Sequence, residues 1–337
     1  MSERAYLDWN ATAPLRPEAR AAMLAALDLA GNASSVHAEG RAARQLIEAA
    51  RAQVATLVGA EAKNITFTGG ATEANMLALT PSLEAGGRKA PRDRLFVSAI
   101  EHPSVRGGGR FAADQVEELP VTGDGVLDLA ALEQRIATAE RPLVSVMLAN
   151  NETGVIQPIR AIADVVHAAN GLLHVDAVQA VGRIDCRMDD LGADLLSLSS
   201  HKLGGPQGAG ALVRRADVHI AEPLIRGGGQ ERGIRAGTEN VAGIAGFGAA
   251  AVAAVAKRET DAARMAALRD RLEAEIAHAT PQAVIFGQGA ARLPNTTLVG
   301  LAGIKAETAI ISFDLNGVAV SSGSACSSGK VQASHVL

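Results

Sequence analysis

From Asn64 onward, short runs of β-branched residues and leucine alternate with longer stretches whose apolar residues recur at helical spacing. Short apolar runs bounded by glycine, proline or polar residues are typical of strands, and strands interleaved with helices indicate a parallel sheet. We therefore predict an α/β fold with a seven-stranded, mostly parallel sheet flanked by helices. The seven predicted strands are NITFTG, DRLFVSA, DQVEELPV, PLVSVMLAN, GLLHVDA, DLLSLSS and GAGALVRR.

Several of these strands run into small or polar residues at their carboxyl ends. In open α/β sheets, ligands bind in the crevice outside the carboxyl ends of the strands. We therefore expect these polar segments to converge on one site. The segments are TGGATEAN, ANNETG, DAVQA and SSHKLGG.

The pattern changes after an alanine-rich run at 241–256, which indicates a buried helix. Residues 257–279 carry apolar side chains at helical spacing with charges on the other faces, and we interpret them as the start of a new unit. We predict a large domain over 15–256 and a small α+β domain formed by 1–14 and 257–337. The later elements of the small domain are the strands AVIFGQ and NTTLVGL, the helix KAETAIISFDL and the strand GVAVSS.

Composition and charge argue against several classes of protein. Hydrophobic residues make up 48% of the 337 positions, and a net charge of -4 with scattered charges provides no basic surface for nucleic acid or anionic lipid. The charged N-terminus is unlike a signal peptide, and the run at 241–256 is shorter than the ~20 residues that span a bilayer. Cys186 and Cys326 form neither a disulfide framework nor a zinc site. We expect a cytoplasmic protein without a metal site.

A glycine turn at Gly69 and Gly70 connects a predicted strand to a predicted helix. Backbone N–H groups at the start of a helix, together with the positive end of its dipole, suit a phosphate group. The sequence is neither a Walker loop nor a GxGxxG motif. The alternative is an ordinary strand-to-helix turn in which Thr72 caps the helix.

Two charged residues follow predicted buried strands. Asp176 needs a donor or cationic partner, because burying an isolated carboxylate is costly, and a helix cap or structural ion pair is the alternative. Beside a pyridoxal ring, such a carboxylate would keep the ring nitrogen protonated, and Gln179 follows three residues later. Lys202 in SSHKLGG is a Schiff-base candidate because desolvation lowers the pKa of a lysine, although most lysines lie on the surface.

The other candidates carry little weight singly. His102 in SAIEHPSV and Asn151 in MLANNETG are also compatible with ordinary loop residues. The glycine- and arginine-rich segment 226–240 suits an anion or a surface loop. Cys326 stands in SSGSACSSGK, a serine and glycine loop that can neither bury the thiol nor hold it still. Unless the loop is incidental, its sulfur has to travel.

Taken together and in this order, the motifs resemble the cysteine desulfurases, which are pyridoxal-phosphate enzymes of fold type I that supply sulfur for iron-sulfur clusters. The form SSGSAC resembles the subgroup with a long, mobile cysteine loop. The resemblance covers nearly the whole chain. It rests on YLDWNATAP, GNASSVHAEGRAAR, GGATEAN, EHPSV, ANNETG, HVDAVQA, SSHKLGGPQGAG, GGGQERGIRAGTEN and SSGSACSSGK.

The resemblance implies a role for each matching residue. Lys202 would form the Schiff base and remove the Cα proton, His102 would stack on the ring, and Cys326 would be the nucleophile. Cys186 matches no catalytic position and is interpreted as structural. The remaining cofactor-binding set would be Asp176 at the pyridine nitrogen, Gln179 at the phenolic oxygen, Asn151 at the ring oxygen or substrate carboxylate, Ala71, Thr72, Ser199 and His201 at the phosphate, and Thr238 reaching the phosphate from the second subunit of a homodimer.

The resemblance also implies a reaction and its partners. The Cys326 thiolate would attack the sulfur of L-cysteine bound to pyridoxal 5'-phosphate, leaving L-alanine and a persulfide on Cys326. A serine and glycine loop would let that sulfur visit both the site and an acceptor protein, such as an iron-sulfur scaffold. Neither nucleic acid nor membrane is expected as a partner.

Three departures from the family pattern affect these expectations. Trp9 stands where the family usually has Asn, and Ala333 stands where it usually has Pro. Family members also continue well past Leu337, through a segment that holds the arginine for the substrate carboxylate. We therefore expect this chain to hold the cofactor but to use cysteine poorly, unless Arg226, Arg232 or Arg235 substitutes.

Two other readings remain open at this stage. One is a selenocysteine lyase or another small-amino-acid enzyme of the same fold, in which Cys326 is incidental. The other is a non-catalytic sulfur-relay or scaffold protein. The presence of Lys202, Asp176 and His102 argues against the second reading.

Overall fold

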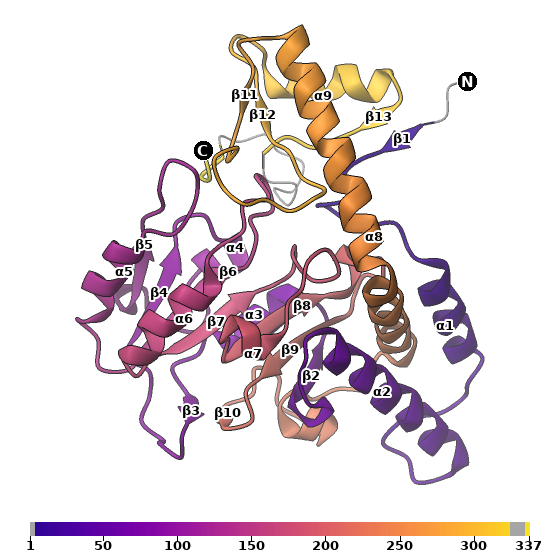
Figure 1. The fold of residues 1–337 in the computed structure, drawn as a ribbon. Helices are drawn as coiled ribbons and strands as arrows, with labels where there is room; N and C mark the ends of the chain where they lie inside the picture. Colours follow the sequence, from indigo (N-terminus) through magenta and orange to yellow (C-terminus); the bar gives the residue numbers. More distant parts are fainter. Residues whose placement is uncertain (1–3, 324–333) are drawn as a thin grey trace.

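The centre of the computed structural model is a seven-stranded sheet with helices on both faces (Figure 1), and residues 4–323 and 334–337 are described. All seven predicted strands lie in this sheet. Strand β9 is antiparallel to both of its neighbours and the other pairs are parallel, so the prediction of a mostly parallel sheet is confirmed. The spatial order is β2 (Ile65–Thr68), β9 (Gly210–Arg214), β8 (Leu195–Ser199), β7 (Leu172–Asp176), β6 (Pro142–Met147), β4 (Arg94–Ser98) and β5 (Val116–Leu119).

The central strands are apolar throughout because both of their faces are covered. Every residue of β6, β7 and β8 is buried. Successive side chains point to opposite faces, so Leu143 joins the core beneath one layer of helices and Val144 joins the core beneath the other. One face packs against α2 (Ala38–Leu57), α6 (Ile159–Ala168) and the first part of α8 (Val241–Ala279), and the other packs against α3 (Ala71–Ala78) and α4 (Pro103–Arg106).

Short elements complete the layers around the sheet. Strands β3 (Leu83–Ala85) and β10 (Val218–Ile220) form a separate antiparallel pair. The remaining elements here are α1 (Pro17–Leu27), α5 (Leu129–Ile136), α7 (Met188–Leu191) and the 3-10 turns η1 (Ala62–Asn64), η2 (Ala113–Gln115), η3 (Ser200–Lys202) and η4 (Gln230–Gly233).

Helix α8 joins two stretches that differ in sequence pattern. Residues 257–279 continue the alanine-rich helix without a break, since no glycine or proline interrupts the chain there. Burial changes along the helix. The buried residues of its first half lie between Gly243 and Ala254, whereas Glu273 is the one buried residue of its second half. By length and composition α8 is able to cross a membrane, but 56% of its most apolar window is buried inside the protein, as in a core helix.

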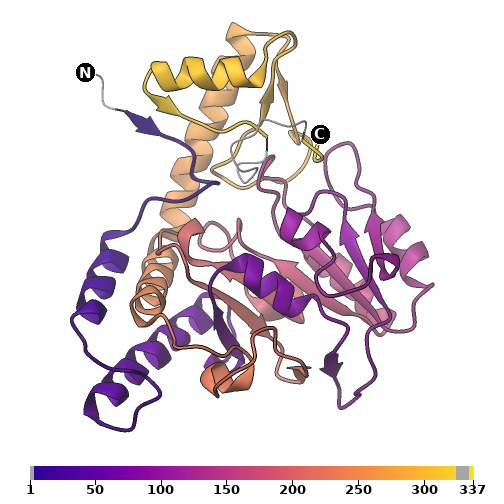
Figure 2. The ribbon, with the colours of Figure 1, turned by 180° about the vertical axis from the view of Figure 1, so that it is seen from behind.

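The far end of α8 carries the last part of the described chain (Figure 1). This part comprises β11 (Val284–Ile285), β12 (Val299–Gly300), α9 (Ala306–Leu315) and β13 (Val318–Ala319). Strand β1 (Ala5–Tyr6) pairs in parallel with β13, so the N-terminus returns to this unit (Figure 2). The division into domains at 14/15 and 256/257 stays a prediction.

Candidate active site

A cavity of about 770 Å³ lies at the carboxyl ends of the central strands. Its lining includes predicted site residues that lie up to 131 positions apart in the sequence, from Ala71 to Lys202. Thr238 does not line it, and Cys326 and Ala333 lie outside the described residues. The predicted residues that line the cavity are Ala71, Thr72, His102, Asn151, Asp176, Gln179, Ser199, His201 and Lys202.

The start of α3 forms one wall of the cavity. Its N-cap residue is Gly70, which has no side chain, so the alternative in which Thr72 caps the helix is wrong. The first N–H groups of a helix have no partner within it, and here they border the cavity. Gly210 of β9 lies against this turn, and a Cβ at that position would stand 2.6 Å from the carbonyl carbon of Gly70. Gly70 and Gly210 therefore allow a close approach of two backbones at a helix end whose free N–H groups suit an anion.

Asp176 ends β7 with both carboxylate oxygens bonded. Oδ1 accepts from the backbone N–H of Val178 at 3.0 Å, and Oδ2 accepts from Asn75 Nδ2 at 3.0 Å. The same amide nitrogen donates to Ser104 Oγ at 2.9 Å. These bonds compensate for burying the carboxylate. Sequence reasoning missed Asn75 and Ser104, and the only available signal for Asn75 was a polar residue in the apolar helix TEANMLAL.

His102 is held in one tautomer. Its Nδ1 accepts from the backbone N–H of Ser104 at 3.1 Å and lies 2.8 Å from Ser104 Oγ. A backbone N–H can only donate, so the neutral ring carries its proton on Nε2. Because Ser104 also binds Asn75, the imidazole and Asp176 are fixed by one chain of hydrogen bonds.

Two buried groups next to the site have pKa values far from the ordinary ones. His174 lies between Ser145 and Ser197, and burial lowers its pKa to about 4, so it stays neutral below Asp176. Burial raises the pKa of Glu101 to about 8. Its Oε1 accepts from Ser98 Oγ and from the backbone N–H of Met147. Glu101 thus fixes the turn that presents His102.

Lys202 lies in η3, directly after β8, with its side chain directed at the loop before α1. Its Nζ donates to the backbone carbonyls of Asn10 and Ala11, the latter at 2.9 Å. The neighbouring His201 contacts Thr12 Oγ1 at 3.1 Å, and burial, with Lys202 close by, lowers the pKa of this imidazole to about 4. The expectation of a buried lysine is confirmed, since Lys202 is only 6% exposed.

The amide of Gln179 has a fixed orientation, in which its Oε1 accepts from the buried Arg183 and its Nε2 is the donor on the side of the cavity. Arg183 Nη1 donates to Gln179 Oε1 at 2.6 Å, and Gln179 Nε2 donates to the Asn10 carbonyl at 3.0 Å. Arg183 also binds the carbonyl of Trp9 at 3.2 Å. The indole of Trp9, where the family usually has Asn, is partly exposed and takes no part in these bonds.

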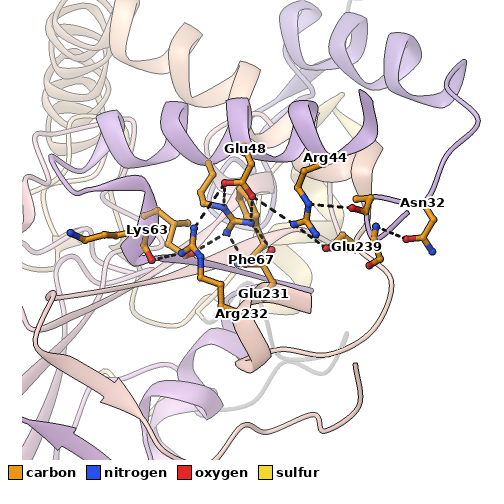
Figure 3. Close-up of polar contacts among 12 residues, drawn as sticks. Asn32, Arg44, Glu48, Lys63, Phe67, Glu231, Arg232 and Glu239 are labelled. Carbon is orange, nitrogen blue, oxygen red and sulfur yellow. Dashed lines mark hydrogen bonds and ion pairs between the residues drawn. The ribbon is translucent and has the colours of Figure 1, made fainter. Parts of the chain in front are cut away.

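The segment 226–240 is anchored beside the main cavity. Arg51 and Glu231 form a buried bidentate pair at 2.7 and 2.8 Å, and Glu231 also accepts from the backbone N–H of Phe67 (Figure 3). This pair holds Glu231 and Arg232 at positive φ. Thr238 lines a smaller cavity next to Gly69.

None of the three arginines proposed to substitute at the substrate carboxylate lines the main cavity. Arg235 pairs with Glu73 at 2.8 Å, and Arg232 donates to the carbonyl of Lys63. Arg226 is exposed. The structure therefore gives no support to that substitution.

The donor set fits pyridoxal phosphate. The start of α3 suits the phosphate, Asp176 suits a protonated ring nitrogen, the amide nitrogen of Gln179 suits the phenolic oxygen, and Lys202 suits the aldehyde. A Cβ on Gly70 would meet no atom within 4 Å, so there is open space beside this turn. Across the described ranges, no group of three or more His, Cys, Asp or Glu residues is arranged to hold a metal ion.

Comparison with known proteins agrees with this geometry. The family pattern "Aminotransferase class-V" matches residues 5–336. A cysteine desulfurase of Cereibacter sphaeroides is 44% identical over 99% of this chain and 86% of its own length. The crystal structure of a NifS-like protein from Rickettsia africae superposes with a TM-score of 0.88 at 36% identity, covering 96% of this chain and 88% of that one. A structure of SspA in complex with cysteine has a TM-score of 0.78 at 29% identity, covering 98% and 93%.

Proposed function

The chain belongs to the cysteine desulfurases of the class-V aminotransferase family, and we propose the following division of roles among its residues. The reaction of this family converts L-cysteine to L-alanine and transfers the sulfur to an enzyme cysteine as a persulfide. The observation that carries the proposal is the meeting of Lys202, Asp176 and His102 in one cavity, because a Schiff-base lysine and a carboxylate for the ring nitrogen are what pyridoxal phosphate requires.

When bound, pyridoxal phosphate supplies an electron sink for the bonds at the Cα of the substrate. Asp176 would stabilise the protonated ring nitrogen, and Asn75 fixes this carboxylate through the 3.0 Å bond to Oδ2. Ala71, Thr72, Ser199 and His201 would hold the phosphate. His201 would do so as a neutral imidazole, since its pKa of about 4 keeps it uncharged at physiological pH.

Lys202 would hold the cofactor aldehyde and would serve as the base for the Cα proton of the substrate, with its Nζ also able to return that proton. The carbonyls of Asn10 and Ala11 accept from Nζ and so stabilise the protonated form. His102, with its proton on Nε2, would orient the cofactor ring.

Cys326 receives the sulfur. Its thiolate would attack the substrate sulfur, and the bond from that sulfur to Cβ would break with its electron pair left on Cβ. Protonation of Cβ would then give the methyl group of L-alanine, and Cys326 would keep the sulfur as a persulfide. Cys186 is unsuited to this step, because burial raises its pKa to about 12 and keeps the thiol protonated. One cysteine is therefore the acceptor, and the other packs in the core.

We assign the partners on the same basis. A homodimer would bring Thr238 of the partner subunit to the phosphate, which accounts for its position outside the cavity of its own chain. The persulfide passes to a sulfur-acceptor protein, such as an iron-sulfur scaffold. A cytoplasmic location stays a prediction.

The test is to incubate the purified full chain with L-cysteine and to follow the visible absorbance, alanine release and protein persulfide together. We expect a change in the cofactor band, alanine equal to the sulfur transferred, and persulfide on Cys326. L-selenocysteine serves as the alternative substrate, and L-alanine, which has no sulfur to transfer, serves as the control. A cofactor band with no alanine from cysteine but turnover of selenocysteine would contradict the assignment.

A further inference from the structure

Asn10 contacts two of the proposed cofactor-binding residues but is not itself one of them. It lies between β1 and α1, and its backbone carbonyl accepts from two cofactor-binding side chains. These are Lys202 Nζ and Gln179 Nε2, the latter at 3.0 Å. The next carbonyl, of Ala11, takes a second bond from Lys202 at 2.9 Å. The orientation of the lysine amine therefore depends on where this short loop is held.

The side chain of Asn10 holds the loop in place through bonds to three residues. Its Nδ2 donates to the Asn151 carbonyl at 3.1 Å and to Thr296 Oγ1 at 3.0 Å, and its Oδ1 accepts from Asn295 Nδ2 at 3.1 Å. Both amide hydrogens and the amide oxygen are thus engaged. A surface asparagine in an ordinary turn has no need for such a set of partners.

The partners Asn295 and Thr296 belong to a junction segment, residues 291–296, between the sheet and the far unit. This segment bonds to the sheet side through Ile156 and Gly154, at 2.8 Å each. It is also tied to α8, because Arg292 forms a bidentate pair with Glu273 at 2.7 and 2.8 Å. A displacement of the junction would reach Asn10 directly.

We propose that Asn10 is a positioning residue that couples the junction segment 291–296 to the Lys202 amine. The inference rests on the proposed function, in which Lys202 is the residue that bonds the cofactor. Two fixed carbonyls favour the protonated amine, because hydrogen bonds to the charged form stabilise it. Loosening Asn10 weakens both bonds without removing either carbonyl.

The other titratable groups that line the cavity with Lys202 are few among the described residues. They are Glu73 of α3, His102 at the start of α4, Asp176 of β7 and His201 of η3. The guanidinium of Arg183 lies behind Gln179 and reaches the carbonyl of Trp9. None of these groups bonds to the Asn10 side chain, so a change at that side chain leaves their bonds in place.

The experiment measures the pH dependence of cofactor loading in the full chain stripped of pyridoxal phosphate. Loading needs the neutral amine, so the pH midpoint of its rate reports on Lys202. We compare Asn10→Ala, Asn295→Ala, Thr296→Val and the double variant Asn10→Ala with Asn295→Ala. Asn316→Ala is the matched control, since the side chain of Asn316 donates to the Ser312 carbonyl at the end of α9 and does not line the cavity. Thermal unfolding of each variant is recorded in parallel.

We expect the midpoint to fall by ~1 pH unit in Asn10→Ala and by ~0.5 unit in Asn295→Ala and Thr296→Val, as part of a bond to a charged group is lost. The double variant moves no further than Asn10→Ala, because Asn295 acts through Asn10. An unchanged midpoint in Asn10→Ala overturns the inference. If Asn10→Ala does not fold, unchanged midpoints in both Asn295→Ala and Thr296→Val overturn it. Borohydride reduction and peptide mapping of the loaded wild type test the proposed function separately from the role of Asn10. A label on a residue other than Lys202 refutes the proposed function.

Discussion

The carboxyl edge of the sheet and the unit beyond residue 280 differ sharply in burial. Every residue of β6, β7 and β8 is buried, whereas α9 has no buried residue. Ile311 and Leu315 of α9 are 60% and 81% exposed. The proposed cofactor residues that line the cavity lie in the first region, and β13 of the second region precedes Cys326 in the sequence. The difference indicates that the proposed cofactor site stands on a rigid scaffold and that the described unit beyond residue 280 is the less stable region.

This arrangement suits a reaction with two requirements. Ring chemistry needs its groups fixed within a fraction of an ångström, which a sheet packed on both faces provides. Sulfur delivery, as proposed, needs one group to reach two places, and a region with few buried residues, such as the described unit beyond residue 280, opens at a lower free-energy cost than the sheet. Each of the following predictions separates the two regions by perturbing one of them.

The largest effect is expected from Lys202→Ala. Loss of the amine removes both the covalent anchor and the base, so the visible band disappears and kcat/KM falls by a factor on the order of 10⁴. Absorbance, borohydride labelling and alanine release measure this. Lys257→Ala is the control, since its side chain is 59% exposed on α8. A reducible linkage that survives in Lys202→Ala would show that the lysine is misassigned.

Cys326→Ala tests the second region alone. We expect the cofactor band and its response to L-cysteine to persist, because every group at the ring remains, while turnover falls by a factor on the order of 10³ and persulfide is absent. Mass spectrometry of the protein after cysteine treatment detects the persulfide. The matched variant Cys186→Ala should keep both. Persulfide on Cys186 in the Cys326→Ala protein would contradict the separation.

Two bidentate ion pairs allow the stabilities of the regions to be compared. Arg51 and Glu231 anchor the sheet side, and their side chains are 2% and 3% exposed. Removing one partner leaves a buried charge, so Arg51→Met should lower the free energy of unfolding by about 3 to 5 kcal/mol. Arg292→Met breaks the pair with Glu273 near the junction and should cost about 2 kcal/mol.

Urea unfolding measures both values, and hydrogen exchange locates the change. Exchange should quicken in β2 for Arg51→Met and around β11, β12 and α9 for Arg292→Met. If both variants lose the same free energy of unfolding and show faster hydrogen exchange throughout the chain, the two regions unfold as one unit.

The smallest expected effect is a pH dependence of stability from Glu101. Burial raises its pKa from an ordinary 4.5 to about 8, so the folded state binds this proton between those values and the unfolded state does not. Stability therefore falls as pH rises through that window. Glu101→Gln keeps an oxygen for Ser98 and Met147 and removes the titration, so the variant should gain on the order of 2 kcal/mol relative to wild type between pH ~6.5 and ~8.5. Thermal melts across this range test it; parallel curves for the two proteins would show that Glu101 does not titrate there.

Much of the fold follows from local pattern. Each of the seven strands is a short apolar run with a turn at its end, and such runs encode burial and direction without any distant partner. The polar residues at strand ends were located for the same reason, since parallel strands bring their carboxyl ends to one edge. Helix α8 shows the limit of this reasoning: composition changes near residue 256, but a change of environment along a helix does not end it.

The sequence by itself determined the sheet, the glycine turn before α3 and nine of the residues that line the cavity, through periodicity, turn chemistry, strand ends and the resemblance of its motifs to a family. Only the tertiary structure decided their partners. Asn75 meets Asp176 across 101 positions, and Asn10 meets Thr296 across 286. A hydrogen bond requires a donor and an acceptor within about 3 Å in space, and the spacing of residues along a chain does not carry that distance until the elements have packed.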